Sequence, residues 1–222
     1  VYFSRTNDLL MQRNLPTVSG FNKVYQNMGE TANKGVEITL NSRNIVLKDF
    51  TWSTNLVFSW NKNEIKDLYG DGQDDIANRW FIGQPIGVIY DYEKVGIWQE
   101  DEIAAGEHLN WDPIAKAGDV KLKDQNGDGV ITDADRKVLG QTSPKWIGGM
   151  TNTFTWKDLT LSVFVQTVQG VMKNNTLIGM AGDEMGRRNT ATEIGYWTPE
   201  NKSNEWRSLR KDSNPHGYGF PC

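Results

Sequence analysis

Apolar and polar residues alternate along several stretches of the chain, with the period expected of a β-strand that has one apolar face. In residues 50–60 the even positions are mostly large and apolar, whereas the odd positions are mostly small and polar. The large apolar residues are Phe50, Trp52, Leu56, Phe58 and Trp60. Residues 146–156 and 159–166 alternate in a similar way. This period of two predicts long strands whose two faces meet different surroundings, and helical periodicity is nearly absent.

Short polar turns join some of these predicted strands. Lys157-Asp158 separates Trp156 from Leu159, two apolar residues that point to the same face if they pair across a two-residue turn. Lys48-Asp49 lies in an equivalent position between Leu47 and Phe50. Upstream of that turn the apolar positions change from even to odd within residues 41–44. We expect a β-bulge there, and an additional strand break is the alternative.

Weaker strand signals cover residues 1–10, 79–83 and 87–98, which gives about seven strands in all. The connections between strands are either very short or long and polar. The long ones are residues 11–32, 62–78, 99–144 and 171–222. The fold class is therefore all-β, an antiparallel up-and-down meander. Short turns at one end and long loops at the other are typical of an outer-membrane β-barrel, and we see no second domain boundary.

A soluble β-sandwich is the alternative fold, because its strands also alternate. The aromatic residues favour the barrel. Phe50, Trp52 and Trp156 lie beside the short turns, and Trp60 and Trp146 lie at the other ends of their strands. Such bands are typical of the two interfaces of a membrane, whereas a sandwich places its largest side chains in mid-strand. The side chains that distinguish the two folds are Trp52, Phe58, Val163 and Val165, which face lipid in a barrel and protein in a sandwich.

Composition excludes several other classes of protein. The 222 residues are 37% hydrophobic and 11% aromatic, and the net charge is −4. The aromatic content argues against disorder, the absence of a long apolar run argues against membrane helices, and the charge gives no reason to expect a nucleic-acid partner. The single cysteine, Cys222, excludes a disulfide framework and a cysteine-based zinc site.

Residues 124–135, within the long 99–144 segment, have the spacing of an EF-hand-like calcium loop. Oxygen-bearing side chains stand at positions one, three, five, nine and twelve, Gly129 stands at the sharp turn, and Ile131 is the apolar anchor. The predicted ligands are Asp124, Asn126, Asp128, the Val130 carbonyl, Thr132 through a water, and Asp135. Asp at position twelve predicts a weak, structural Ca²⁺ site of the kind found outside cells. A metal-free turn is the alternative.

The segments beside this loop predict only half of an EF-hand. Residues 133–140 read as a short helix that ends at Gly140, whereas residues 118–123 alternate like a strand. We therefore expect the metal to act as a structural clip.

Other candidate sites are weaker. Asp71, Asp74 and Asp75 form an acidic cluster that predicts a solvated loop, with a second metal site as the alternative. His108 and His216 are isolated in the sequence, so we expect neither a zinc site nor a catalytic His pair. No catalytic motif is present, so we expect no enzyme. Aromatic residues in or beside the long loops are candidate ligand contacts, because exposed rings stack on sugars, although packing of the loops on each other is the favoured alternative. They are Trp80, Trp98, Trp111, Trp197 and Trp206, of which the last four are the predicted contacts.

Five stretches together carry a family resemblance. They are Asn33-Lys34-Gly35-Val36-Glu37-Ile38, Lys48-Asp49-Phe50-Thr51-Trp52 with Asn61-Lys62-Asn63, Gly83-Gln84-Pro85-Ile86-Gly87, Gly118-Asp119-Val120-Lys121 running into the calcium loop and Ser143-Pro144-Lys145, and Tyr196-Trp197-Thr198-Pro199-Glu200-Asn201. With them the chain resembles the SusC/RagA-type TonB-linked outer-membrane transporters of Gram-negative bacteria.

The resemblance implies an importer of large nutrients, most often oligosaccharides and sometimes peptides. It implies a roughly 22-stranded outer-membrane β-barrel in contact with lipid, a plug, a SusD-like lipoprotein lid and energy from the TonB complex. The plug, the TonB contact of the N-terminal region and the final strands have no counterpart in residues 1–222, so we expect a fragment of the barrel domain.

Loop length predicts the orientation, with short turns periplasmic and long loops, including the calcium loop, extracellular. The alternative function is that of a secreted or surface calcium-stabilised β-domain that binds glycans as a module.

Overall fold

The computed structural model describes residues 1–14, 20, 23–27, 29–174, 194–210 and 212–219. Its strands are paired in antiparallel sheets, as the alternation predicts. The chain divides into two compact units, which are described separately below. The first comprises residues 1–88 and 141–171 and is called the sheet unit. The second comprises residues 89–140 and 172–222 and is called the loop unit. Cys222 lies outside the described residues.

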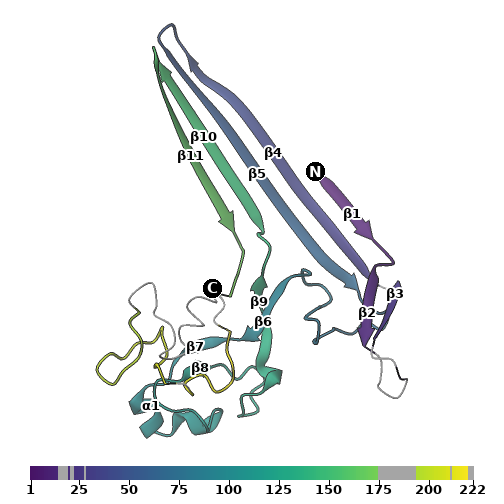
Figure 1. Cartoon of the computed structure of the whole chain (residues 1–222), viewed down its shortest axis with the longest axis vertical. Helices are drawn as coiled ribbons and strands as arrows, with labels where there is room; N and C mark the ends of the chain where they lie inside the picture. Colours follow the sequence, from purple (N-terminus) through teal and green to yellow (C-terminus); the bar gives the residue numbers. More distant parts are fainter. Residues whose placement is uncertain (15–19, 21–22, 28, 175–193, 211, 220–222) are drawn as a thin grey trace. The chain divides into compact units, whose positions relative to one another are not determined.

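The sheet unit contains a five-stranded sheet in the order β1-β4-β5-β10-β11. Its strands are β1 (Tyr2–Thr6), β4 (Glu30–Val46), β5 (Phe50–Asp67), β10 (Trp146–Trp156) and β11 (Leu159–Gln169). Figure 1 shows the four long strands running side by side. A separate antiparallel pair is formed by β2 (Leu10–Asn14) and β3 (Lys23–Asn27).

The predicted turns and the bulge are confirmed. β10 and β11 pair without a break until Trp156 stands opposite Leu159, across the two-residue turn. At the other hairpin the Leu47 N–H donates to the Phe50 carbonyl at 2.8 Å. The register of β4 against β5 shifts between Arg43 and Ile45, where the apolar phase changes. The inserted residue places Ile45 on the same face as Ile38 and Leu40.

This register gathers most of the apolar side chains of β4, β5, β10 and β11 on one face. They include Ile38, Leu40, Phe50, Trp52, Leu56, Phe58, Trp146, Met150, Phe154, Trp156, Leu161, Val163 and Val165. Val163 is 44% exposed and Val165 56%. Trp52 stacks on Phe154 near the turns, and Phe58 lies against Trp146 toward the other end. These apolar side chains therefore form an exposed face of the sheet rather than a packed core.

The structure explains why the stretch Asn33–Ile38 contains a glycine, Gly35. It stands opposite both Tyr2 of β1 and Asn61 of β5. A Cβ atom on Gly35 would lie 2.7 Å from the Trp60 carbonyl oxygen and closer still to the Tyr2 ring. The Asn61 amide donates to the Tyr2 hydroxyl at 2.6 Å. The missing side chain therefore lets the Tyr2 ring cross the sheet.

The loop unit is built on two short strand pairs. β6 (Val88–Tyr92) pairs with β9 (Arg136–Gln141), and β7 (Lys94–Ile97) with β8 (Val120–Leu122). A helix α1 (Glu100–Ala104) and the 3₁₀ helices Glu107–Asn110 and Asp133–Asp135 complete the described elements. One cluster of its buried apolar residues consists of Tyr92, Ile97, Val120, Leu122, Ile131, Trp197 and Tyr218. Within the described residues, no helix has the length and apolar character needed to cross a membrane.

Some sequence predictions were wrong in detail. The helix expected over 133–140 is only the 3₁₀ turn Asp133–Asp135, because the following residues pair with β6 as strand β9. Residues 79–83 form no strand beyond a single bridge between Asp75 and Trp80, since Arg79 adopts a left-handed conformation with φ 58°.

Two longer strand predictions were also too simple. The strand expected over 87–98 is divided into β6 and β7 at Glu93. The first predicted strand ends at Thr6, ahead of Asp8, which has φ 56°.

Candidate functional site

The carboxylate of Asp124 is the centre of the predicted calcium loop. Its two oxygens accept hydrogen bonds from the N–H groups of Gly127 at 2.7 Å and Gly129 at 2.9 Å. Both glycines adopt positive φ, 74° and 82°, which an L side chain rarely tolerates. These backbone donors, that of Gly129 first, lower the pKa of Asp124. The chain therefore wraps around a carboxylate held in its charged form.

Positions three and five of the loop hold each other. Asn126 accepts from the Asp128 N–H at 2.9 Å and donates from its Nδ2 to Asp128 Oδ2 at 2.9 Å. Asp128 Oδ1 also accepts from the Val130 N–H at 2.9 Å. Each polar side chain thus fixes the backbone two residues further on, as short Asp and Asn side chains do in tight turns.

Asp135, at position twelve, ties the two ends of the loop together. Its carboxylate accepts from the N–H of Gln125 and from the N–H of Thr132, each at 2.8 Å, and the residue is completely buried. Thr132 in turn caps the following 3₁₀ turn by accepting from the Ala134 N–H at 3.2 Å. The end of the loop is therefore closed by side chains of the predicted ligand set.

The predicted ligand atoms are of the chemical type that calcium prefers. Every predicted ligand is an oxygen, which is what Ca²⁺ prefers, and the shell of an EF-hand includes amide and backbone oxygens as well as carboxylates. Among the described residues, no three His, Cys, Asp or Glu side chains are gathered so that they could hold a metal ion. The ligand oxygens engage backbone and neighbouring amide donors instead. Calcium binding therefore remains a prediction.

The predicted calcium loop is anchored at two points. Ile131 joins it to the core of the loop unit, and Gln125 joins it to a charged cluster around Glu93. Ile131 is 5% exposed, and its N–H donates to the Trp111 carbonyl at 3.0 Å. Glu93 accepts from Lys137 at 2.6 Å and from Gln125 at 2.8 Å, and Lys123 lies 3.4 Å away. These partners, Lys137 first, lower the pKa of Glu93 to about 2.

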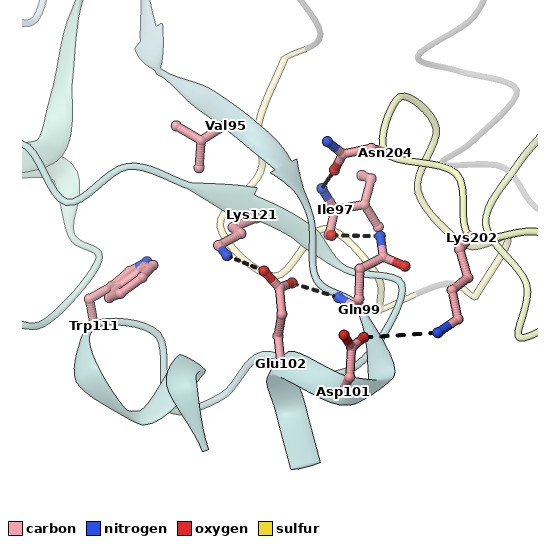
Figure 2. Close-up of a pocket in the computed structure, with 9 residues that line it drawn as sticks. All are labelled: Val95, Ile97, Gln99, Asp101, Glu102, Trp111, Lys121, Lys202 and Asn204. Atoms are coloured by element: carbon pink, nitrogen blue, oxygen red, sulfur yellow. Dashed lines mark hydrogen bonds and ion pairs between the residues drawn. The ribbon is translucent and has the colours of Figure 1, made fainter. Parts of the chain in front are cut away.

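A groove of about 610 Å³ lies beside Trp111, entirely within the loop unit (Figure 2). It is lined by Val95, Ile97, Gln99, Asp101, Glu102, Trp111, Lys121, Lys202 and Asn204. The Lys121 ammonium lies 2.6 Å from the Glu102 carboxylate and 4.2 Å from the centre of the Trp98 ring. Glu102 also accepts from the Gln99 N–H at 2.9 Å, which caps α1. The centre of the groove is therefore a fixed ion pair.

The loop tryptophans differ in their accessibility. Trp98 is completely buried, and Trp197 is 6% exposed with its indole N–H donated to Gln99 at 2.9 Å. Both pack inside the unit, so the structure does not support ligand contact by these two residues. Trp111 and Trp206 are partly exposed, and Trp111 lines the groove.

Sequence reasoning missed the buried pairs of the loop unit. His216 is not isolated, because its Nε2 lies 3.0 Å from the completely buried carboxylate of Asp112. Arg210 pairs with Asp119, whose pKa is raised by burial. The partners lie about a hundred residues apart in sequence, and no local pattern marks them.

The acidic cluster in the sheet unit forms turn-stabilising hydrogen bonds. Asp75 accepts from the Tyr69 hydroxyl at 2.6 Å, and Asp74 accepts from the Ile82 N–H at 2.7 Å. These contacts agree with the predicted loop, and no second metal site is proposed.

Comparison with known proteins groups the chain with TonB-dependent receptors. No protein-family model matches it. It is 36% identical over 217 residues to the TonB-dependent receptor P3 of Formosa agariphila, covering 92% of this chain and 21% of the relative. Receptor P26 of the same organism is 34% identical with the same two coverages. The TonB-dependent receptor SusC of Bacteroides thetaiotaomicron is 29% identical over 164 residues, 72% of this chain and 16% of the relative.

Solved structures share the fold. The RagAB peptide transporter superposes with a TM-score of 0.67 and 23% identity, covering 93% of this chain and 23% of that one. The closed-closed state of the RagAB peptide importer gives a TM-score of 0.60. The chain belongs to the TonB-dependent receptors of the SusC/RagA type, as the sequence motifs indicate. It spans about a fifth of the length of the curated relatives that it matches.

Proposed function

We propose that the chain is part of an outer-membrane importer that takes up nutrients with energy delivered through TonB. The observation that carries the proposal is the match of 92% of the chain to TonB-dependent receptors. The exposed apolar face of the sheet agrees with it, because a receptor strand must present such a face to lipid. The proposed role is transport and includes no catalytic step.

We infer that the long strands are staves of a roughly 22-stranded barrel. β10 and β11 have 11 residues each, a length that spans the hydrocarbon at the usual tilt. In this barrel the apolar face that includes Val163 and Val165 contacts lipid. The turns at Lys48-Asp49 and Lys157-Asp158 face the periplasm, and the loop unit faces the medium.

We also propose that residues 124–135 bind Ca²⁺ as a structural clip. The ligands would be Asp124, Asn126, Asp128, the Val130 carbonyl, Thr132 through a water, and Asp135. The spacing of these residues, the two left-handed glycines and the buried Asp135 support the proposal. When bound, the ion supplies a fixed positive charge that compensates the carboxylates of the loop. A weak site would be filled in a calcium-containing medium.

The proposed partners follow from the relatives. A SusD-like surface lipoprotein would cover the extracellular side, and the TonB complex would act through a part of the protein that residues 1–222 do not include. The substrate we propose is an oligosaccharide, while the structural relative is described as a peptide transporter. Residue identity of 23% to that structure supports a shared fold and does not assign a peptide substrate.

Deletion of the gene in its host tests the import proposal. Growth on purified oligosaccharides as the sole carbon source should be lost, and a strain without TonB should show the same defect. Growth on a monosaccharide that crosses general porins is the control. Unchanged growth on every oligosaccharide and peptide tested would refute the proposal.

Calorimetric titration tests the calcium clip separately. Ca²⁺ should bind the native chain with a dissociation constant of roughly 10⁻⁴ to 10⁻³ M, and Asp128→Ala should abolish the heat. No binding by the native chain would refute the clip while leaving import open.

A further inference from the structure

We propose that the groove beside Trp111 is a binding site for a neutral sugar unit. The inference rests on the proposed import of oligosaccharides and deepens it, because it names the residues that contact the substrate and the charge class of that substrate. It uses only the loop unit, within which all lining residues lie.

The charges of the groove cancel. Asp101, Glu102, Lys121 and Lys202 line it, two of each sign, and Figure 2 shows them as two neighbouring pairs. Lys202 lies 4.0 Å from Asp101, and Lys121 lies 2.6 Å from Glu102. Recognition of a sulfate, phosphate or uronate would require an excess of cations. A balanced site favours a ligand with hydroxyl groups and no net charge.

The inner pair is held in one geometry. The side chain of Lys121 is 17% exposed, and its ammonium also contacts the Trp98 ring. The side chain of Glu102 is 25% exposed and also accepts from the Gln99 N–H. An ammonium has three donors and a carboxylate about four acceptor sites, so neither is exhausted by the pair. A hydroxyl that donates to Glu102 and accepts from Lys121 satisfies both, and adjacent hydroxyls of a sugar ring are spaced for this arrangement.

Apolar surface and an amide donor complete the lining. Trp111 stands at one end of the groove and Val95 is 48% exposed beside it, which suits the C–H faces of a sugar ring (Figure 2). The Trp111 ring is kept in place by its indole N–H, which donates to the Leu122 carbonyl at 3.2 Å. Asn204 accepts from the Ile97 N–H at 2.8 Å, which orients its amide at the groove wall.

The backbone of the groove argues against a peptide ligand. Extended peptides are commonly bound through the free N–H and C=O groups of a strand edge. At the end of β7, however, the Ile97 N–H is bonded to Asn204 and the Ile97 carbonyl accepts from Gln99 at 2.9 Å. Side chains therefore occupy both backbone groups of Ile97, and the groove offers side-chain groups and an aromatic ring instead.

Titration calorimetry on the whole chain in detergent micelles tests the proposal. The probes are cellohexaose, laminarihexaose and mannohexaose, a hexamer of alginate, and an uncharged hexapeptide. At least one neutral hexasaccharide should bind, and the alginate hexamer and the peptide should bind at least tenfold more weakly. Asp101→Ala and Trp111→Ala should each weaken the neutral sugar about tenfold, the loss expected for a contact to a charged group or a stacking ring.

Two control variants keep the test decisive. Asp101→Ala breaks an exposed lysine–aspartate pair within the groove, and Lys116→Ala breaks one outside it, where Lys116 lies 2.8 Å from Asp212, so Lys116→Ala should leave binding unchanged. Trp111→Phe keeps a ring and should retain most of the affinity. Tighter binding of alginate or peptide, no binding of any neutral sugar, or binding insensitive to Asp101 and Trp111 would overturn the inference. The growth test decides import independently of each of these results.

Discussion

The backbone N–H of Ile131 donates to the carbonyl oxygen of Trp111 at 3.0 Å. Ile131 is position eight of the proposed calcium loop, and Trp111 is the ring at the end of the groove. One hydrogen bond thus joins the two candidate sites. Gly129 also lies close to the residue before Trp111, because a Cβ atom added there would lie 3.0 Å from the Asn110 carbonyl oxygen. A displacement of the loop backbone at Ile131 should therefore also displace the backbone of Trp111.

Calcium should stabilise the loop unit. With the ion at ten times its dissociation constant, the free energy of unfolding should rise by about 1.4 kcal/mol, since the ion binds only the folded loop. Thermal unfolding followed by tryptophan fluorescence measures the change. Asp124→Asn should abolish the calcium effect, whereas Asp71→Asn, outside the loop, should not. Equal stabilisation by calcium in both variants would contradict the assigned ligands.

The side chain of Ile131 should matter far more than that of its neighbour. Ile131→Ala removes a buried side chain from the core, with an expected loss of about 2–5 kcal/mol of stability. Val130 is 50% exposed, so Val130→Ala should change stability by less than about 0.5 kcal/mol. Urea unfolding of the two variants, compared with the native chain, gives both values. Similar losses would mean that the loop is not anchored through Ile131.

Acid should weaken the loop through Glu93. The pKa of this carboxyl falls from 4.5 to about 2, because Lys137 and Gln125 stabilise its charged form. A depressed folded-state pKa gives stability that is fully present above the unfolded value, near 4.5, and is lost as pH falls toward 2. Unfolding midpoints measured from pH 6 to pH 2 should show this loss. Glu93→Gln should have lower stability at pH 6 and a flatter profile, and an unchanged profile would contradict the assignment.

Gly35 should be intolerant of a side chain. Gly35→Ala places a methyl group against the Tyr2 ring and the Trp60 carbonyl, which should cost about 1–3 kcal/mol. Gly149 of β10 is the matched control, because a Cβ atom there meets the Phe164 ring at an ordinary 3.5 Å. Unfolding of both variants in lipid or detergent measures the difference. An equal effect of the two substitutions would show that the close approach at Gly35 has no energetic weight.

Strong alternation made much of the sheet predictable from the sequence. The β10 strand, its two-residue turn and the bulge before Ile45 all follow from the local alternation of apolar and polar residues. That alternation determines which residues pair and which face of the sheet each side chain occupies. Residues 136–141 were mispredicted because a six-residue segment carries too little periodicity to separate helix from strand. Its pairing with β6, far away in sequence, decides the outcome.

The candidate site was only partly predictable for the same reason. The calcium loop is one continuous motif, so its ligands can be named from spacing alone. The groove joins Glu102 and Lys121 to Lys202 and Asn204, which are far apart in sequence. The exposure of each tryptophan also depends on the folded unit, which is why Trp98 and Trp111 have different roles.

The proposed barrel requires the face of β11 that carries Val163 to meet lipid. Spin labels at Val163→Cys and Ser162→Cys, each in a Cys222→Ser background in lipid vesicles, test it by their accessibility to oxygen and to an aqueous nickel complex. We predict that the label at Val163 is relaxed by oxygen, and that the label at Ser162 on the opposite face is relaxed by the nickel complex. Protection of the Val163 label from both reagents, or the reverse pattern, would contradict a lipid-facing barrel wall.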